Sequence, residues 1–208
     1  MLKKLKIRGR LVLSFSTMVL LTLIITAASL VGLRASGDNL NDFIDHSYTA
    51  DTAIKMCRIE ANVAARTVRE MTLDANPANM SGYKAKIDEN ITALKADIEV
   101  LKNSYPEQDG LVDQYEKNVN DWINEATNIV AQLEKGENAV AANLILTKCS
   151  PALQTLVDTA KQLDGKLEIL QNETLATSQS IIDNVSLAVF VLLIVSVLMC
   201  IVLAIKVT

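Results

Sequence analysis

Two long apolar runs stand near the ends of the chain. Residues 11–33 are 23 positions without a charge, and residues 184–205 are 22 more. At a rise of about 1.5 Å per residue each run forms a helix of roughly 33 Å, enough to cross a hydrocarbon core of about 30 Å. The first run could instead be a cleaved secretory signal, but the apolar part of such signals usually has only about 7 to 15 residues. The pattern therefore predicts two transmembrane helices.

Between these runs, apolar residues recur at alternating steps of three and four, which places one apolar stripe on each of four amphipathic helices. The stripes are Ile54, Cys57, Ala61, Ala64, Val68 and Met71; Ile87, Ile91, Leu94, Ile98, Leu101 and Tyr105; Tyr115, Val119, Trp122, Ala126, Ile129 and Leu133; and Cys149, Leu153, Leu156, Ala160, Leu163, Leu167 and Leu170. Such spacing is typical of coiled-coil-like bundle packing. The predicted fold class is all-α, an antiparallel up-down four-helix bundle whose first and last helices continue into the transmembrane helices.

Three short segments interrupt the helical pattern, at residues 74–82, 103–110 and 134–138. They contain the residues that commonly end helices, namely Pro77, Gly82, Pro106, Gly110 and Gly136. No alternating run is long enough for a strand. With only seven Gly and three Pro in 208 residues, the composition suits a chain that is nearly all helix.

The first and fourth helices have no break on the membrane side. Helix one needs about 40 residues, or roughly 60 Å, whereas the two inner helices of about 25 residues each reach only about 37 Å. Pro151 is expected to kink the fourth helix or to mark where it restarts. The membrane-proximal part then has two helices per chain, which bury their stripes poorly alone, so the pattern predicts a symmetric homodimer.

The distribution of charge predicts the topology. Five basic residues lie in the first ten positions, without an acid: Lys3, Lys4, Lys6, Arg8 and Arg10. By the positive-inside rule, residues 1–10 are cytoplasmic, and with two spans the stub 206–208 is cytoplasmic too. Residues 34–183 then form an extracytoplasmic domain that holds 14 basic residues against all 24 acids. Nucleic-acid binding is not expected of an acidic domain outside the membrane.

Arginine is concentrated in one stretch of this acidic domain. Apart from Arg34, all its arginines (Arg58, Arg66 and Arg69) lie in "CRIEANVAARTVREMTLD", residues 57–74, and elsewhere the domain uses lysine. Together with Asn62 they form a column at about 40° to 120° around the helix, beside the apolar stripe near 320°. Arg66 has Glu70 at i+4, but Arg58 and Arg69 have no acid three or four residues away. These two must be solvated, pair across helices, or await an anion.

Height along the bundle places other polar residues near the arginines. Counted from the membrane, Arg66 and Arg69 lie roughly 50 Å up helix one, and Cys149 lies at a similar height on the fourth helix. Thr147, Ser150, Gln154 and Thr155 would share this level. Hydroxyls and an amide facing guanidinium groups suit a small carboxylate ligand, so the candidate ligand-binding residues are Arg58, Asn62, Arg66, Arg69, Thr147, Ser150 and Gln154. A solvated face, or pairing with acids of neighbouring chains, is the alternative.

Other candidate chemistry is sparse. His46 has no second His or Cys at metal-ligand spacing, so no metal site is expected. Cys57 and Cys149 are expected to be packed small side chains, and Cys200 lies inside the second apolar run. No phosphate loop, nucleophile elbow or zinc helix occurs, so the sequence predicts no catalytic residue, no cofactor and no enzymatic activity.

The opening "LKIRGRLVLSF", the span that follows it, "RIEANVAARTVREM" on helix one, a "PAL" in helix four and a closing span together resemble the sensor half of a bacterial methyl-accepting chemotaxis receptor. The resemblance covers essentially the whole chain. It implies a homodimer in the cytoplasmic membrane of a bacterium, with a ligand bound near the membrane-distal end between helices one and four. It also implies that Arg58, Arg66 and Arg69 match positions that hold ligand carboxylates.

Receptors of this family continue past the second span into a long cytoplasmic signalling region, whereas this sequence stops at "KVT". The chain is therefore expected to be the input half of a longer receptor, or a truncated form that works through a partner. The input module of a sensor histidine kinase or a cyclase is an alternative, and so is a structural membrane protein whose ectodomain binds another protein. The ligand could arrive alone or on a ligand-loaded binding protein.

Overall fold

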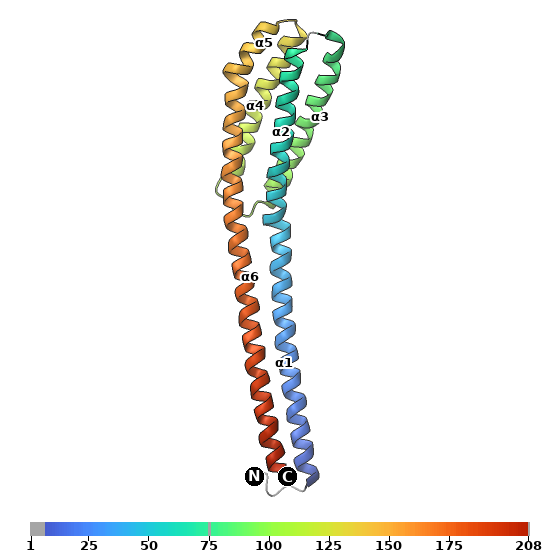
Figure 1. Cartoon of the computed structure of the whole chain (residues 1–208), viewed down its shortest axis with the longest axis vertical. Coiled ribbons are helices and arrows are strands. Elements are labelled where there is room, and N and C mark those ends of the chain that lie inside the picture. Colours follow the sequence, from blue (N-terminus) through green and yellow to red (C-terminus); the bar gives the residue numbers. More distant parts are fainter. Residues whose placement is uncertain (1–6, 75, 208) are drawn as a thin grey trace. The chain divides into compact units, whose positions relative to one another are not determined.

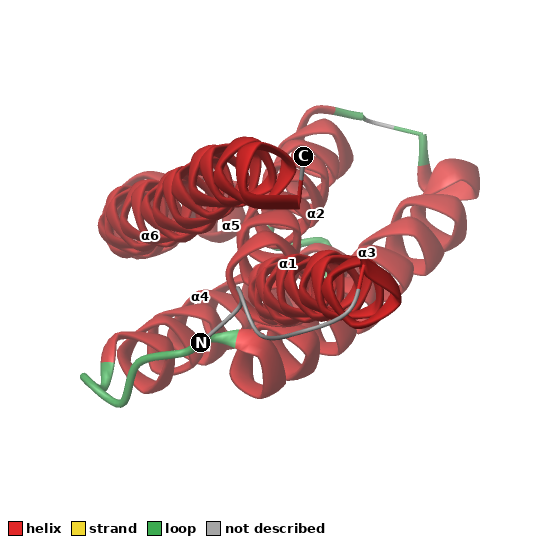
Figure 2. Cartoon of the chain, turned by 90° about the horizontal axis from the view of Figure 1, so that it is seen from below, coloured by secondary structure: helices red, strands yellow, loops and turns green. Residues whose placement is uncertain are grey.

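The computed structural model describes residues 7–74 and 76–207, and within them it contains helices joined by short loops and no strand (Figures 1 and 2). The chain divides into two compact units. The bundle unit is Asp42–Asn172, and the two-helix unit combines Met1–Asn41 with Glu173–Thr208. The predicted all-α four-helix bundle is confirmed.

Helix one continues without a break from the two-helix unit into the bundle unit, as expected. It consists of α1 (Ile7–Phe43), a π-helical turn (Ile44–Tyr48) and α2 (Thr49–Leu73). The π-helical turn carries no Pro or Gly. Its carbonyls take extra hydrogen bonds: the Thr49 hydroxyl donates to Ile44 O at 2.6 Å, and the Gln171 amide donates to Ser47 O at 3.4 Å.

The two inner helices are α3 (Met80–Ser104) and α4 (Leu111–Glu134), close to the lengths expected. Asp74 organises the turn before α3. Its carboxylate accepts hydrogen bonds from Asn76 N, Asn79 Nδ2 and Tyr83 Oη at 2.8 to 3.0 Å, and these bonds lower the pKa of Asp74. Gly82 was expected in this turn but lies inside α3.

The two later turns each use a glycine for its backbone. Gly110 and Gly136 both have φ of +78°, in the left-handed region that is unfavourable for residues with a Cβ. Gly110 stands directly before α4, and Gly136 lies in the turn before α5 (Asn138–Leu144). These turns reverse the chain so that α3, α4 and the fourth helix pass up and down beside α2 (Figure 1).

The fourth helix consists of α5, a π-helical turn (Ile145–Cys149) and α6 (Ser150–Val207). Pro151 explains the π-helical turn, because proline has no N–H to give to Thr147 O and its ring would collide with that carbonyl in a regular α-helix. The wider turn removes this collision and the helix then continues. Pro151 thus marks a local change of winding at the position where a kink or restart was expected.

The predicted stripes form the core of the bundle unit. Every residue of the first and third stripes is buried, and so are all but the terminal leucine of the fourth; Ile91, Tyr105 and Leu170 are half-buried. Tyr115 and Trp122 are the largest fully buried side chains among the described residues. Burial at heptad spacing on all four helices is what holds this unit together.

The two-helix unit follows a different period. Its least exposed positions recur at steps of four, four and three, an 11-residue repeat. They are Leu21, Ile25, Ala28, Gly32, Ser36 and Asn39 on α1, and Thr174, Ser178, Ile181, Val185, Val189, Leu192, Ser196 and Cys200 on α6. Asn39 Nδ2 lies 3.4 Å from Ser178 Oγ across this seam. The two helices therefore pack on each other along one continuous face.

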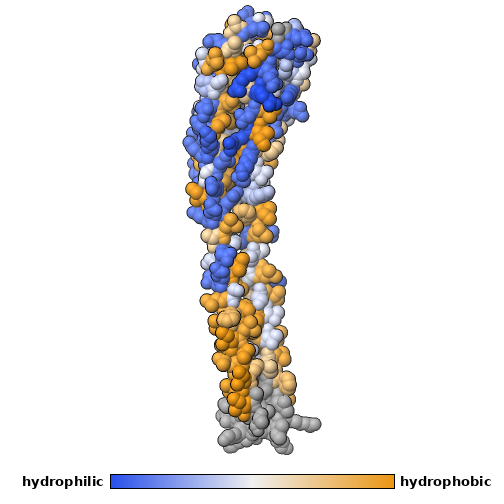
Figure 3. Space-filling model, viewed as in Figure 1, coloured by the Kyte–Doolittle hydropathy of each residue, from blue (hydrophilic) through white to orange (hydrophobic). Residues whose placement is uncertain are grey.

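Both helices of this unit are long and apolar enough, by length and composition, to cross a membrane. Only 6% and 0% of their most apolar windows are buried, which distinguishes them from core helices of a soluble domain. Their outward side chains form the apolar surface seen in orange over the lower parts of α1 and α6 in Figure 3. A membrane-spanning role fits this surface.

At Gly32, α1 and α6 lie too close together for a side chain to fit. A Cβ at Gly32 would lie 2.4 Å from Val185 Cγ1, and the β-branched Val185 cannot move aside freely, whereas a Cβ at Gly37 would meet nothing within 4 Å. We expect Gly32→Ala to separate the two helices and Gly37→Ala to leave them in place. Disulfide cross-linking between cysteines at positions 39 and 178, with the native cysteines replaced, should fall at least about threefold for Gly32→Ala. Equal cross-linking in both variants would contradict this packing.

Candidate functional site

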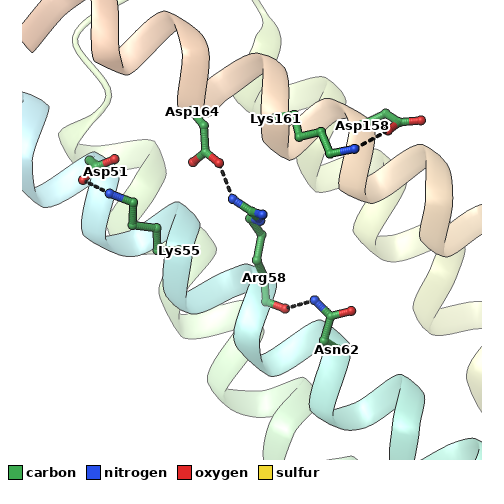
Figure 4. A network of polar contacts seen from close by, with 7 residues as sticks. All are labelled: Asp51, Lys55, Arg58, Asn62, Asp158, Lys161 and Asp164. Carbon is green, nitrogen blue, oxygen red and sulfur yellow. Dashed lines mark hydrogen bonds and ion pairs between the residues drawn. The ribbon is translucent and has the colours of Figure 1, made fainter.

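The arginine column lies on α2. Helical spacing places it on a face next to the buried stripe, outside the core. Arg58 is half-buried, and Asn62, Arg66 and Arg69 are exposed. The Asn62 amide donates to Arg58 O at 2.7 Å, which fixes it against the helix (Figure 4). The three guanidinium groups have different partners, and this distinguishes them chemically.

Arg58 reaches across the bundle to α6. Its Nη1 donates to Asp164 Oδ2 in a short ion pair, which joins two residues 106 positions apart (Figure 4). The other oxygen of this carboxylate, Oδ1, is buried without a hydrogen-bond partner. Of the three possibilities for Arg58, the structure adopts pairing across helices. Sequence reasoning missed Asp164, whose position beside the buried Leu163 was the available signal.

Arg66 and Arg69 have no partner on another helix in the described part of the chain. Arg66 Nε lies 3.3 Å from Glu70 Oε1, which confirms the expected surface pair, worth about 0.3 kcal/mol. Arg69 makes no ion pair with a described residue. Burial raises the pKa of the Cys149 thiol, while Trp122 and the charge of Arg69 act in the opposite direction. Arg69 and Cys149 therefore lie near each other, consistent with the predicted height.

The expected partners on the fourth helix bind within that helix. Thr147 Oγ1 donates to Asn143 O at 2.8 Å, Gln154 Nε2 donates to Asp158 Oδ1 at 2.9 Å, and Thr155 Oγ1 donates to Pro151 O at 3.1 Å. Ser150 is half-buried. No described contact joins these residues to the arginines, so their part in a ligand site stays a prediction.

An open groove of about 450 Å³ runs along the exposed face of α2. Its lining is Lys55, Arg58, Ile59, Asn62 and Val63. Lys55 is held by Asp51 at 2.6 Å, which raises its pKa, so the groove carries two cationic groups beside an apolar floor. Such a surface is suited to a small anion with an apolar part, and it has only one wall within the chain.

The core of the bundle unit also contains polar atoms, among them a thiol, a hydroxyl and an indole nitrogen. The Cys57 thiol donates to Leu94 O at 4.0 Å, and burial raises its pKa to about 12. The Tyr115 hydroxyl, beside this thiol, and Trp122 Nε1, beside Cys149, are buried without a hydrogen-bond partner. The two cysteines are packed core residues, as expected.

His46 is exposed, and its Nδ1 lies 3.2 Å from Asp42 Oδ1. Within residues 7–74 and 76–207, no group of three or more His, Cys, Asp or Glu is placed to hold a metal ion.

Comparison with known proteins identifies one family. Residues 4–176 match the model described as a four helix bundle sensory module for signal transduction. The match includes the whole bundle unit and all of α1. Comparisons with curated proteins and with solved structures give no match.

The raised pKa of Cys57 leads to a measurable protection. At pH 9.0 a thiol with a pKa of about 12 is only about 0.1% thiolate, so Cys57 should react with iodoacetamide at least about 100 times more slowly in the folded chain than in the unfolded one. The rate should rise only as the pH approaches 12. The measurement uses a chain in which Cys149 and Cys200 are replaced by Ala. Reaction at the rate of the unfolded chain would show that this part of the core is open.

Proposed function

The chain belongs to the four-helix-bundle sensory modules for signal transduction, and we propose that it is the ligand-sensing input half of a transmembrane chemotaxis receptor. Membership of this family gives the chain the role of a sensory input domain. The proposal adds a small, carboxylate-bearing ligand, binding outside the membrane, and a helix shift that passes the signal inward.

The observation that carries the ligand class is the groove on α2, which Arg58 and Asn62 of the arginine column line. Arg58 lines the groove with a guanidinium of which one N–H group is used by Asp164. Arg69, three turns further along α2, has no ion pair with a described residue. Guanidinium groups bind carboxylates in bidentate fashion, and the apolar Ile59 and Val63 would cover the rest of a small organic acid.

A homodimer would supply the missing wall of the groove. Opposite its buried stripe, α2 carries a second row at heptad spacing: Thr52, Met56, Ile59, Val63, Arg66, Glu70 and Leu73. Three of its apolar members are exposed, Met56 by 39%, Ile59 by 53% and Leu73 by 85%, and Val63 is half-buried. A second copy of α2 packed on this row would bury them and bring its own arginines beside the first set.

The proposed location is the cytoplasmic membrane of a bacterium, with both termini in the cytoplasm and the bundle unit outside. The support is the pair of apolar helices and the basic residues 1–10. Of these, residues 1–6 and the side chains of Arg8 and Arg10 lie outside the described part of the chain.

Transmission would use α6, which is one uninterrupted helix from Ser150 to Val207. The seam between α1 and α6 contains small or polar side chains at Ser36, Asn39, Thr174 and Ser178. Few large apolar side chains then lock the register there, so a small sliding or rotation of α6 costs little. A ligand can drive it only through different affinities for the two positions.

Two further functions share parts of this support. The same module could precede a histidine kinase or a cyclase, and the ligand could arrive on a binding protein. A structural membrane protein that binds another protein through its ectodomain would need the exposed row of α2 but not the arginines. Signalling is proposed in preference to catalysis because the site holds binding groups without a nucleophile or general base paired to it.

The carboxylate proposal is tested by a ligand screen on the full chain in lipid nanodiscs. Small mono- and dicarboxylic acids, amino acids and amines are added while unfolding is followed by the fluorescence of Trp122, the chain's single tryptophan. A ligand at 100 times its Kd should stabilise the bundle by about 2.7 kcal/mol. Arg69→Ala should lose this response, and Lys84→Ala, which removes a cation paired with Glu134, should keep it. A wild-type chain that responds to no carboxylate would contradict the proposal.

The transmission proposal is tested by breaking α6. In a chimera carrying a cytoplasmic output domain, Thr177→Gly with Ser178→Pro should abolish the response and leave ligand binding intact, because the pair interrupts the helix outside the ligand site. Alanine at both positions preserves the helix and should preserve the response. A full response from the Gly-Pro chimera would exclude a signal carried by continuous α6.

A further inference from the structure

Three buried polar side-chain atoms in the described part of the chain lack a hydrogen-bond partner, and two of them lie near Arg58. They are the Tyr115 hydroxyl on α4 and Asp164 Oδ1 on α6. Buried polar groups in folded proteins are nearly always satisfied, so a neighbouring pair of unused groups calls for a physical reason. Here one group is a donor and the other an acceptor.

Helix geometry places Tyr115 and Asp164 at nearly the same height. One turn away, Asn118 Nδ2 donates to Thr159 Oγ1 at 2.7 Å and joins α4 to α6. Because these helices run antiparallel, three residues back along α4 and five residues forward along α6 lead in the same direction, by about 4.5 and 7.5 Å. The two residues therefore differ in height by about 3 Å.

Electrostatics also places them together. Burial raises the pKa of the Tyr115 hydroxyl first, the Cys57 thiol raises it further, and the charges of Arg58 and Asp164 act on it in opposite directions. The Tyr115 hydroxyl thus lies within range of the ion pair that crosses from α2 to α6. Its hydrogen-bonding neighbour is the Cys57 thiol, a weak partner, so it has little to lose if it turns toward Asp164.

We propose that Asp164 is a positioning residue with two alternative donors: Arg58 when the groove on α2 is empty, and the Tyr115 hydroxyl when a ligand carboxylate occupies Arg58. The first arrangement is the one in the structure, where Arg58 holds Oδ2 and the Tyr115 hydroxyl is unused. In the second, Asp164 keeps a hydrogen bond inside the bundle, and the whole guanidinium fork becomes available to the ligand.

The exchange would change the helix to which Asp164 is bonded. With Arg58, Asp164 fastens α6 to α2; with Tyr115, it fastens α6 to α4. Ligand binding would therefore release α6 from the helix that carries the groove, and the half-buried Asp164 carboxylate would still have a hydrogen bond. The ligand step rests on the proposed function, but the presence of a second donor for Asp164 does not, and the two are tested separately.

The second donor is tested without ligand by a double-mutant cycle on the full chain in nanodiscs, with unfolding followed by Trp122 fluorescence. Tyr115→Phe alone should change the melting temperature little, because the hydroxyl has only the weak Cys57 thiol as a partner. In Arg58→Gln, Asp164 depends on Tyr115, so adding Tyr115→Phe should lower the melting temperature by about 4 °C more than it does in the wild type. Equal shifts in the two backgrounds would overturn the inference.

The control for this cycle is Tyr83→Phe, which removes a hydroxyl that donates to Asp74 in the turn before α3. It should lower the melting temperature by the same amount in both backgrounds. If Arg58→Gln does not fold, Arg58→Met replaces it, because its straight apolar stem preserves the packing.

The ligand step is tested with succinate as the probe. Asp164→Asn removes the competing charge and should tighten succinate binding about tenfold, and Tyr115→Phe should weaken it about tenfold. Asp158→Asn is the matched control, an acid of the same helix that bonds Gln154 and Lys161, and should leave affinity unchanged. Binding that all three variants leave unchanged would overturn the exchange while the proposed carboxylate function stands. Succinate binding by neither wild type nor Asp164→Asn would overturn the ligand-driven step, and the ligand-free cycle would still decide whether Asp164 has two donors.

Discussion

Helix one and α6 are the two helices that leave the bundle unit, and within it the ion pair of Arg58 and Asp164 is the charged contact between them that the structure describes. Removing two charges from water offsets much of their attraction, so such a pair adds little net stability. Breaking it with nothing to replace a partner is costly, because a poorly solvated charge remains. The pair therefore holds a position more than it strengthens the fold, and stability comes from the heptad core around Tyr115 and Trp122.

The spacing of the buried positions differs between the two units, and this gives their helices different resistance to displacement. Heptad spacing in the bundle unit calls for left-handed packing with large apolar residues meeting in layers, which resists displacement. The 11-residue repeat in the two-helix unit has slightly more residues per turn, so the seam runs nearly straight or with the opposite hand. At residues 36–39 and 174–178 this seam consists of small or polar side chains, and Asn39 Nδ2 lies 3.4 Å from Ser178 Oγ. Small contacts of this kind define a register but yield to a modest force.

The sequence predicted what depends on local pattern: the four stripes, the turns and the unbroken outer helices. It could not identify Asp164, because the pairing with Arg58 spans 106 residues and depends on side-chain reach. Counting residues up from the membrane placed Arg69 near Cys149 but offered Thr147 and Gln154 as partners, which instead bond within their own helix. The π-helical turn at Ile44–Tyr48 was missed because no Pro or Gly marks it. The hydrogen bonds to its carbonyls come from Thr49 and from Gln171, which is more than a hundred residues away.

The three arginines of the column are not equivalent, and this bears on how a sensor divides binding from signalling. Arg69 has no ion pair with a described residue, so an anion would gain its full attraction there. At Arg66 an anion would compete with the exposed Glu70, and water easily replaces this weak surface pair. At Arg58 it would compete with a carboxylate on another helix, and part of the binding energy would be spent on moving that helix. Affinity would then depend mainly on Arg69, and the coupling of binding to α6 on Arg58.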